Sequence, residues 1–304
     1  MADTIAPVTN REGLEEYALR WVWGPGWQRP GFTAVVRARD EARSLPFVLP
    51  PLLRSVERVV LVDNGSADGT PEVAEQVAKG AGLAEKLDVY AYPFDVSRCG
   101  PEHLGTHPES VHSLAYFYNW SFSHVRTRYA LKWDADMVPT PRGERALRDL
   151  AWQLEGVEGA ITLRRDPVYV ESERVAYVDT IPGKPEPWGW RNSPEHTFGK
   201  AFDWELMLPQ PGDHVLRLPD SVCFELKWLD ADEFAHWSHS EFKDQINARK
   251  RRDWEVFHAL REGAPLPANL VRVESPGGKH IVEHLRETYA MHRRGTGPSA
   301  AGGR

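Results

Sequence analysis

The stretch that decides the fold of this chain is Tyr129-Ala-Leu-Lys-Trp-Asp-Ala-Asp-Met-Val138. Its apolar first half predicts a short buried strand, which runs directly into Asp134 and Asp136. In an extended chain, residues i and i+2 point to the same side, so the two carboxylates converge at the end of the strand. Converging carboxylate oxygens suit Mg²⁺ or Mn²⁺. Pro139 and Pro141 then end the strand, and ligands of open α/β sheets bind beyond such carboxyl ends.

Two acidic residues spaced by one are not specific on their own. The chain has 44 Asp and Glu among 304 residues, and the same spacing recurs at Asp203-x-Glu205 and Asp230-x-Asp232. The metal-binding hypothesis therefore depends on the elements that come before residue 129 in the chain.

Composition excludes several classes of protein. A formal net charge of −7 argues against a general nucleic-acid binder. No run of 18 apolar residues exists, so we expect no spanning helix, and the N-terminal residues lack the basic and apolar regions of a signal peptide. Only Cys99 and Cys223 are present, which predicts a reducing environment without a disulfide framework. We expect a cytoplasmic protein with no nucleic-acid partner.

Strands and helices alternate through the first half of the sequence. We predict strands at 32–37, 58–63, 87–92 and 129–138, and helices at 44–56, 71–80, 111–127 and 142–154. Prolines at 46, 50 and 51 interrupt the first of these helices. The alternation predicts right-handed βαβ units and a doubly wound sheet.

The second half has a less regular pattern. We predict strands at 159–163, 174–178, 215–218, 222–226 and 270–273, and helices at 240–262 and 280–292. At the N-terminus we predict a short helix at 11–23. Residues 181–200 are rich in Pro and Gly, and we interpret them as a long functional loop. Residues 294–304 have the composition of a disordered tail.

Three features stand in order along residues 32–140. The first predicted strand ends in Arg37-Ala-Arg-Asp-Glu-Ala42, and residues 59–70 read Val-Val-Leu-Val-Asp-Asn-Gly-Ser-Ala-Asp-Gly-Thr. Residues 132–137 read Lys-Trp-Asp-Ala-Asp-Met, with Asn119 in the helix before them. Together these features resemble the nucleotide-sugar-binding half of a GT-A-fold glycosyltransferase, most like family 2. The chain departs from the family pattern at Asn64, where a second Asp is common, and at Trp133, where a small or apolar residue is common.

The resemblance implies an α/β protein with the GT-A fold, a Rossmann-like fold of nucleotide-diphospho-sugar transferases with a mainly parallel central sheet flanked by helices. It implies an N-terminal extension at 1–30 and a catalytic domain at 31–265. Within that domain, 31–140 would bind the nucleotide sugar and 141–265 the acceptor. Residues 266–304 would form a C-terminal segment.

The function that the resemblance implies is metal-dependent transfer of a sugar from a nucleoside-diphosphate sugar to an acceptor hydroxyl or amine, with inversion. The donor would carry UDP, GDP or dTDP, and the acceptor would be small or soluble. Donor-binding residues would be Ala38, Arg39, Glu41, Asp63, Asn64, Ser66, Asn119, Asp134 and Ala135. The metal, Mn²⁺ or Mg²⁺, would be held by Asp134, Asp136 and His236, with His239 as the alternative to His236.

The catalytic base must come from the second half of the chain. Ala201-Phe-Asp-Trp-Glu-Leu206 resembles the acidic segment of the family, although Phe202 replaces its first acid. Carried over, this segment makes Asp203 the general base, with Glu205 as the alternative, and residues 181–200 a lid.

Two other functions remain open at this point. One is a non-catalytic sugar- or nucleotide-binding protein on the same fold. The other is a sugar-nucleotide pyrophosphorylase, a class that has a Gly-rich loop after the first strand. Residues 37–44 contain no glycine, so the pyrophosphorylase is the less favoured of the two.

Overall fold

The computed structural model describes residues 7–24, 26–154, 159–201, 204–207, 210–231, 248–267 and 269–293. The chain divides into two compact units. Unit 1 comprises Met1–Ala135, Glu144–Leu163 and Glu186–Leu218; unit 2 comprises Asp136–Gly143, Arg164–Pro185 and Pro219–Arg304. Each unit has its own sheet, and we describe the two separately.

Unit 1 is built on a seven-stranded sheet with the order β12-β6-β9-β4-β1-β2-β3. These strands are β1 (Arg29–Ala38), β2 (Arg58–Asp63), β3 (Leu87–Ala91), β4 (Thr127–Asp134), β6 (Gly159–Leu163), β9 (Glu186–Arg191) and β12 (His214–Arg217). All neighbours pair in parallel except β9, which runs antiparallel to both β4 and β6. The prediction of an α/β fold with a mainly parallel central sheet is confirmed.

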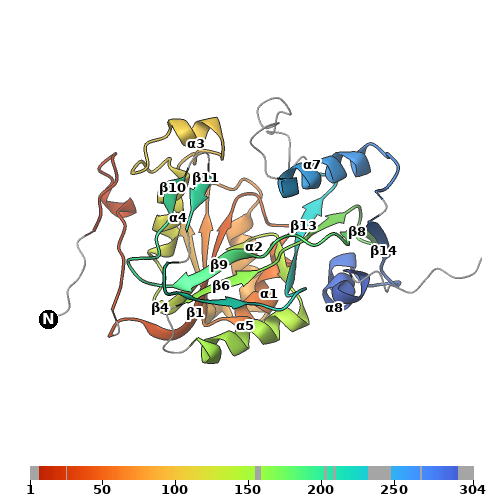
Figure 1. The fold of residues 1–304 in the computed structure, drawn as a ribbon, viewed down its shortest axis with the longest axis horizontal. Helices are drawn as coiled ribbons and strands as arrows, with labels where there is room; N and C mark the ends of the chain where they lie inside the picture. The colour runs from red at the N-terminus through yellow and green to blue at the C-terminus, as the bar shows by residue number, and fades with distance from the viewer. Residues whose placement is uncertain are drawn as a thin grey trace, which may run out of the picture. The chain divides into compact units, whose positions relative to one another are not determined.

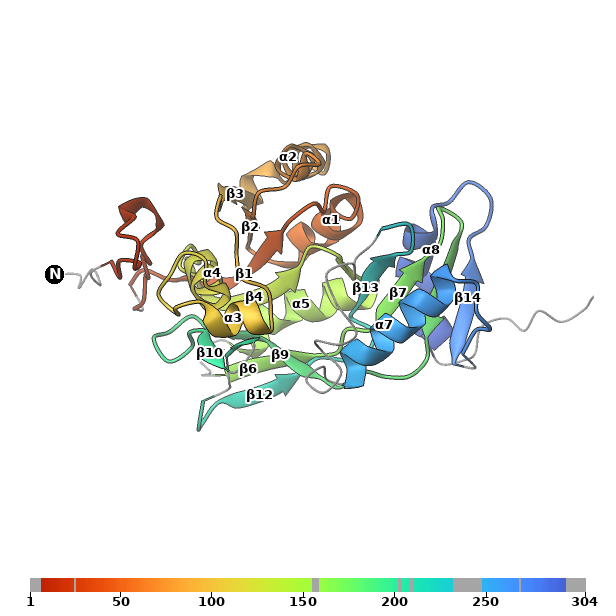
Figure 2. The same cartoon turned by 90° about the horizontal axis from the view of Figure 1, so that it is seen from above.

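Helices cover both faces of this sheet. Helices α1 (Leu45–Ser55) and α2 (Thr70–Gly80) lie on one face, and α4 (Leu114–Phe122) lies on the other (Figures 1 and 2). Unit 1 also contains 3-10 turns at Glu15–Tyr17 and Ala84–Lys86, the short helix α3 (Pro101–Gly105), and a small sheet of β10 (Gly199–Ala201) and β11 (Trp204–Leu206). Among the described helices of the chain, none has the length and apolar character that a bilayer span requires.

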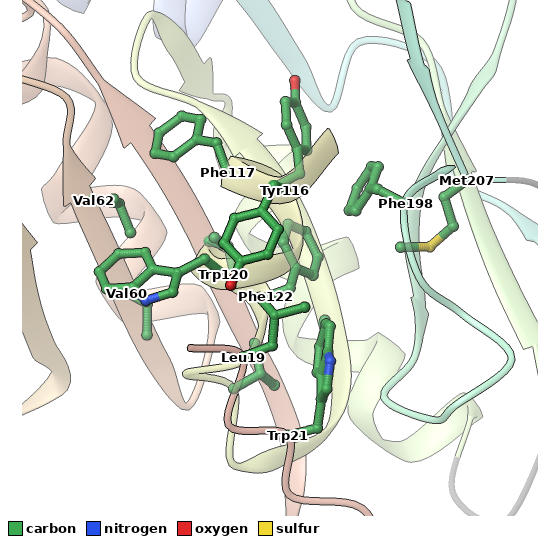
Figure 3. Packing of buried hydrophobic residues seen from close by; sticks show 14 of the residues in the cluster. Leu19, Trp21, Val60, Val62, Tyr116, Phe117, Trp120, Phe122, Phe198 and Met207 are labelled. Carbon is green, nitrogen blue, oxygen red and sulfur yellow. The ribbon is translucent and has the colours of Figure 1, made fainter. Parts of the chain in front are cut away.

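The apolar core of unit 1 lies between α4 and the sheet. Tyr116, Phe117 and Trp120 of α4 belong to the same buried cluster as Val60 and Val62 of β2 (Figure 3). The strand predicted at 58–63 is β2, whose apolar run is buried as parallel strands require. The helix predicted at 111–127 is shorter in the structure, because α4 ends at Phe122 and β4 begins at Thr127.

Helix α1 forms in spite of its prolines. Pro46 lies in the first turn, where the missing N–H has no helical partner to lose. Pro50 and Pro51 lie inside the helix, which buries Pro51 together with Leu45, Val48, Leu49, Leu52 and Leu53. Burial of this leucine-rich face outweighs the two hydrogen bonds that the prolines remove.

Three predictions of local structure were wrong. Residues 11–23 form only a 3-10 turn, together with an isolated bridge between Val8 and Leu19. The predicted loop 181–200 contains strand β9, whose Trp188 and Trp190 are buried. Gly189 of this strand leaves room for the two neighbouring strands. A Cβ on Gly189 would lie 2.9 Å from Ile161 Cδ1 of β6 and 3.1 Å from Leu131 Cδ1 of β4.

The third wrong prediction is the single strand at 129–138. Strand β4 ends at Asp134, a turn follows, and β5 (Met137–Pro139) pairs with a strand of unit 2. The sequence hides this break because buried apolar residues stand on both sides of it, Trp133 before it and Met137 and Val138 after it.

Unit 2 contains a five-stranded sheet with the order β14-β8-β7-β13-β5. Its other strands are β7 (Pro167–Val170), β8 (Val175–Asp179), β13 (Cys223–Trp228) and β14 (Leu270–Glu274), and its helices are α7 (Ala248–Arg261) and α8 (Ile281–Arg293). Tyr169 of β7 faces Tyr177 of β8, and both pack with Val256 and Phe257 of α7. Helix α5 (Pro141–Gln153) begins in unit 2 and continues in unit 1.

The first turn of α5 requires a glycine. A Cβ on Gly143 would lie 1.9 Å from the backbone oxygen of Val222. We expect Gly143→Ala to lower the free energy of unfolding by about 1–3 kcal/mol, because the backbone must move to make room. Urea denaturation measures this change.

The matched control is Gly80→Ala in α2, where an added Cβ would meet no atom within 4 Å. Helix propensity favours alanine there by at most about 1 kcal/mol, so this variant should be as stable as the wild type or slightly more so. Equal stability of the two variants would contradict the close contact at Gly143.

Candidate functional site

The candidate site of unit 1 begins at the carboxyl ends of three adjacent parallel strands. Ala38 ends β1 opposite Asp63, which ends β2, and Arg37 lies opposite Asp134, which ends β4. The order β3-β2-β1-β4 changes direction between β1 and β4, and open α/β sheets bind ligands in the crevice outside such a reversal. Residues predicted from the sequence therefore meet at the edge where a nucleotide is expected.

Hydrogen bonds join the loops that follow β1 and β2. The backbone N–H of Asp40 donates to Ser66 Oγ (2.8 Å), and the N–H of Ala67 donates to Asp40 Oδ1 (2.7 Å). The N–H of Ala42 donates to Asp68 Oδ2 (2.9 Å). Asp40 itself has φ = 58°, an uncommon left-handed conformation for a residue other than glycine. The two loops thus form one cross-linked platform that contains Arg39, Glu41, Asn64 and Ser66.

Asp63 is the most buried acidic residue of this platform, with 8% of its surface exposed. Its carboxylate accepts hydrogen bonds from the N–H groups of Gly65 (3.2 Å) and Ser66 (3.3 Å). An ionised carboxylate offers about four lone-pair positions, so two remain for a further donor. Asp63 therefore both shapes the loop and keeps capacity to accept a hydrogen bond.

Two predicted donor-binding residues hold other parts of unit 1 together. The side-chain amide of Asn64 donates to the carbonyls of Tyr92 (2.9 Å) and Phe94 (2.7 Å). Asn119 exchanges two hydrogen bonds of 2.8 Å with the backbone of Phe198. Asn64 in place of a second Asp thus has a structural reason, because its amide can donate to two carbonyl groups and an ionised Asp could donate to neither.

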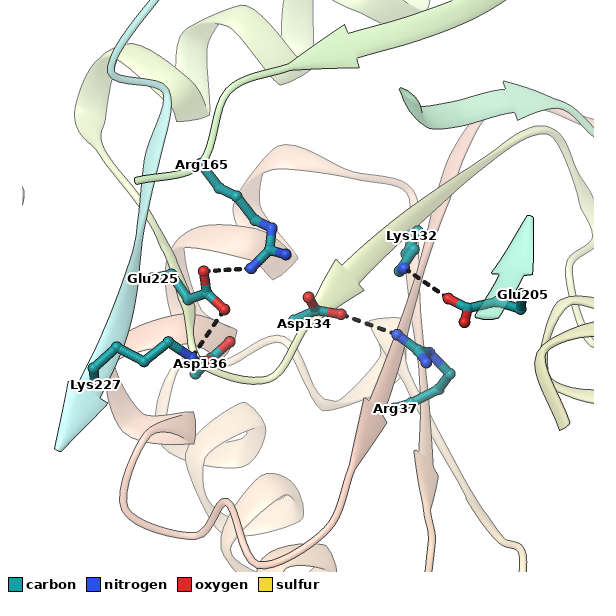
Figure 4. Close-up of polar contacts among 8 residues, drawn as sticks. All are labelled: Arg37, Lys132, Asp134, Asp136, Arg165, Glu205, Glu225 and Lys227. Carbon is teal, nitrogen blue, oxygen red and sulfur yellow. Dashed lines mark hydrogen bonds and ion pairs between the residues drawn. The ribbon is translucent and has the colours of Figure 1, made fainter. Parts of the chain in front are cut away.

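A buried charge network lies beneath the end of β4. Arg37 Nη2 donates to Asp134 Oδ1 at 2.9 Å, and its guanidinium carbon lies 3.6 Å from the centre of the Tyr118 ring (Figure 4). Burial opposes the charge of Arg37, but Tyr118, Asp134 and Glu205 outweigh it, so the pKa of the guanidinium is raised. Arg37 therefore stays charged and holds the Asp134 carboxylate at the strand end.

Glu205 belongs to the same network. Its Oε1 lies 3.4 Å from Lys132 Nζ (Figure 4), and only 11% of its side chain is exposed. Burial raises the pKa of Glu205, but the charges of Lys132 and Arg37 and a hydrogen bond from Tyr118 outweigh it, so the pKa is lowered. Glu205 is thus an ionised partner of these groups, and a carboxylate with a lowered pKa is a weak general base.

In unit 2, Asp136 lies beside a second group of charges. Lys227 Nζ lies 3.2 Å from Asp136 Oδ2 and 2.9 Å from Glu225 Oε1, and Arg165 forms a short ion pair with Glu225 (Figure 4). The backbone N–H of Leu226 donates to the Asp136 carbonyl at 2.9 Å. Asp136 and Glu225 are neighbouring carboxylates of unit 2 that could hold a metal ion.

Sequence analysis missed Glu225. The sequence did contain a signal: Glu225 and Lys227 are charged residues two apart in the otherwise apolar run Val222-Cys-Phe-Glu-Leu-Lys-Trp228. Residues two apart in a strand share a face, so the pair predicts a polar patch on one side of a buried strand. Both side chains are less than 10% exposed in the structure.

The donor set fits a hard divalent cation in its chemistry. Carboxylate oxygens are the ligands that Mg²⁺ and Mn²⁺ prefer. The predicted imidazole ligands His236 and His239 lie outside the described residues, as does the predicted base Asp203.

The described chain has a pocket of about 440 Å³ elsewhere in unit 1. It is lined by Gln28, which precedes β1, and by Arg191, which pairs with Tyr129 near the start of β4. It therefore lies at the amino ends of the parallel strands, and none of the predicted site residues that the structure describes lines it. Buried His196 bridges Ser193 and Asp213 in its wall.

No protein-family model and no curated protein matches the sequence. Among solved structures, the chain is similar to S. aureus TarS 1–349 in complex with UDP, at 13% identity over 74% of this chain and 78% of that chain, with a TM-score of 0.42. It is also similar to the mannosyltransferase PcManGT from Pyrobaculum calidifontis in complex with GDP-Man and Mn²⁺, at 15% identity over 81% and 74%, with a TM-score of 0.44.

A third similar structure is glucosyl-3-phosphoglycerate synthase from Mycobacterium tuberculosis in complex with Mn²⁺, UDP-glucose and phosphoglyceric acid. The identity is 16% over 49% of this chain and 50% of that chain, and the TM-score is 0.27. These structural neighbours are glycosyltransferases. For this chain, the location of the candidate site rests on its own strand order and register.

Glu205→Gln tests the buried charge network. The pKa of Glu205 in the folded protein lies below its ordinary value. Its ionised carboxylate therefore stabilises the fold at pH values above the ordinary pKa, and this stabilisation is lost as the pH falls through the pKa of the folded protein. We expect the variant to lose about 1–3 kcal/mol of unfolding free energy at neutral pH. The difference from the wild type should shrink as the pH falls below about 4.3.

Urea denaturation over this pH range measures the effect, with Glu75→Gln as the control. Glu75 is exposed on α2, so its variant should match the wild type throughout. If Glu205→Gln lowers the unfolding free energy by the same amount at every pH, Glu205 is not an ionised carboxylate paired with these groups.

Proposed function

We propose that this chain is a metal-dependent glycosyltransferase that moves a sugar from a nucleoside-diphosphate sugar to an acceptor hydroxyl or amine, with inversion. The observation that carries the proposal is the alignment of Ala38, Asp63 and Asp134 at adjacent carboxyl ends where the strand order reverses. Doubly wound sheets bind nucleotides at this position. The resemblance of residues 32–140 to the donor half of GT-A enzymes supports the same conclusion.

In this proposal the nucleoside lies against the platform of the two loops. Asp63 accepts a hydrogen bond from the base or ribose through the lone pairs that Gly65 and Ser66 leave open. The cross-links through Asp40 and Ser66 hold the platform in shape before the donor arrives. A preformed platform reduces the ordering cost of binding.

The diphosphate lies beyond the end of β4. Asp136 and Glu225 of unit 2 would hold Mn²⁺ or Mg²⁺, which would neutralise the charge that develops on the leaving diphosphate; Asp134 is the further ligand that the sequence predicts. Arg37 fixes the position of the Asp134 carboxylate through its 2.9 Å hydrogen bond, and the Tyr118 ring holds the guanidinium in place. Arg37 and Tyr118 therefore act on Asp134 as positioning residues.

We assign the general base to Asp203. Of the two candidates, Glu205 is paired with Lys132 and has a lowered pKa, which makes it a poor proton acceptor. Asp203 would deprotonate the acceptor hydroxyl for in-line attack on the anomeric carbon, and the nucleoside diphosphate would leave from the opposite face.

Thermal stability in the presence of UDP, GDP and dTDP, each with and without Mn²⁺, tests donor binding. A nucleotide that binds the site should stabilise the fold by about 2.7 kcal/mol at 100 times its Kd. We expect one diphosphate to shift the melting temperature, and the shift to need the metal. If none of the three shifts it, the chain has no nucleoside-diphosphate site and the proposal fails.

Asp136→Asn separates catalysis from mere binding. With the nucleotide sugar of the diphosphate that stabilises the wild type, we expect release of the diphosphate to slow by at least about 100-fold, because charge stabilisation of the leaving group is lost. Asp230→Asn, at an exposed acid of unit 2, is the control and should keep full activity.

A wild type that binds the nucleotide sugar but releases no diphosphate would favour the non-catalytic alternative. Unchanged release by the Asp136 variant would show that the reaction does not use these carboxylates.

A further inference from the structure

The ammonium group of Lys227 bridges two of the carboxylates assigned to the metal. Its Nζ lies 2.9 Å from Glu225 Oε1 and 3.2 Å from Asp136 Oδ2. Only 7% of the Lys227 side chain is exposed, against 8% for Glu225 and 15% for Asp136. Charge-assisted hydrogen bonds of this length in a desolvated place are strong.

The register of the unit 2 sheet holds this bridge in place. Glu225 and Lys227 lie two apart on β13 and share a face, and Lys227 pairs in the sheet with Tyr169. Glu225 lies opposite Met137 of β5, the residue directly after Asp136. The pairing of β13 with β5 and β7 therefore fixes the position of the ammonium group. Lys227 is a buried residue of this sheet and not a surface lysine.

The charges of this group balance without a metal. Asp136 and Glu225 carry two negative charges, and Lys227 and Arg165 carry two positive charges. A divalent cation needs carboxylate oxygens at about 2.0–2.2 Å. An ammonium within 3.2 Å of the same two carboxylates would then face a like charge at short range, so the two cations compete for one position.

We propose that Lys227 is a built-in competitor of the divalent cation, which must displace the ammonium from Asp136 and Glu225 in order to bind. The inference rests on the proposed metal-dependent function, and it adds that the affinity for the metal is set by a residue that is not a ligand. The lysine keeps the two buried carboxylates paired while the site has no metal, and metal binding releases it.

Titration of the full-length protein with MnCl₂, followed by the electron paramagnetic resonance signal of free Mn²⁺, tests the proposal without any nucleotide. We expect Lys227→Met to lower the Kd for Mn²⁺ by about tenfold or more, because the competing cation is gone; tenfold corresponds to 1.4 kcal/mol. Mn²⁺ should also raise the melting temperature of the variant more than that of the wild type. Lys227→Gln provides the same test if the methionine variant does not fold.

Lys279→Met is the matched control, since Lys279 pairs with Glu287 on the surface of the same unit; its Kd should equal that of the wild type. The gain in affinity should disappear when Asp136→Asn is added to Lys227→Met. Equal or weaker binding by the Lys227 variants overturns the proposal. If neither the wild type nor any variant binds Mn²⁺, the metal site of the proposed function fails as well, which separates the two outcomes.

Discussion

The parallel register of β1 with β2 and β4 is the constraint on which the rest of unit 1 depends. It sets Ala38 opposite Asp63 and Arg37 opposite Asp134, so the predicted site residues of three strands reach one edge of the sheet. A shift of β4 by one residue would turn Asp134 to the other face. It would also take Trp133, which is fully buried, out of its present packing. The bulky tryptophan therefore helps to fix the register that the carboxylate needs.

Charged residues interrupt the apolar strands of both units. Arg37, Lys132 and Glu225 lie in strands whose neighbours are buried. Burying paired charges gives little net stability, and an apolar residue at each position would pack without a desolvation cost. Their presence in two separate networks is best explained by the anionic ligand and the metal that the strand ends are proposed to bind.

Much of the central sheet follows from the sequence because its signals are local. The run Val59-Val-Leu-Val62 and the turn residues after it specify β2 and its loop without any tertiary information. The break between β4 and β5 could not be predicted, because it depends on which sheet the chain joins after Asp134. Strand β9 was hidden by its Pro and Gly content, and Gly189 is explained only by its neighbours in space.

The residues of the candidate site also fall into two groups, those with a local signal in the sequence and those that only the folded chain brings together. Asp63, Asp134 and Asp136 follow from strand ends and turn chemistry, which the sequence displays. Glu225 and its partner Lys227 are distant from them in sequence, and only the pairing of β13 with β5 brings Glu225 to Asp136. Asn64 and Asn119 had the residue types of ligand contacts, but their amides bind backbone carbonyls and amides of this chain.

The most direct test of the proposed nucleotide site is to map nucleoside-diphosphate binding on the sheet by two-dimensional NMR of the backbone amides. We expect the diphosphate and Mn²⁺ to shift the signals of Ala38, Gly65 and Ala135 at the carboxyl ends of β1, β2 and β4. Signals of Arg29 and Arg191, at the opposite edge, should stay in place. Shifts confined to that opposite edge would contradict the proposed site and would direct attention to the pocket of His196 and Asp213.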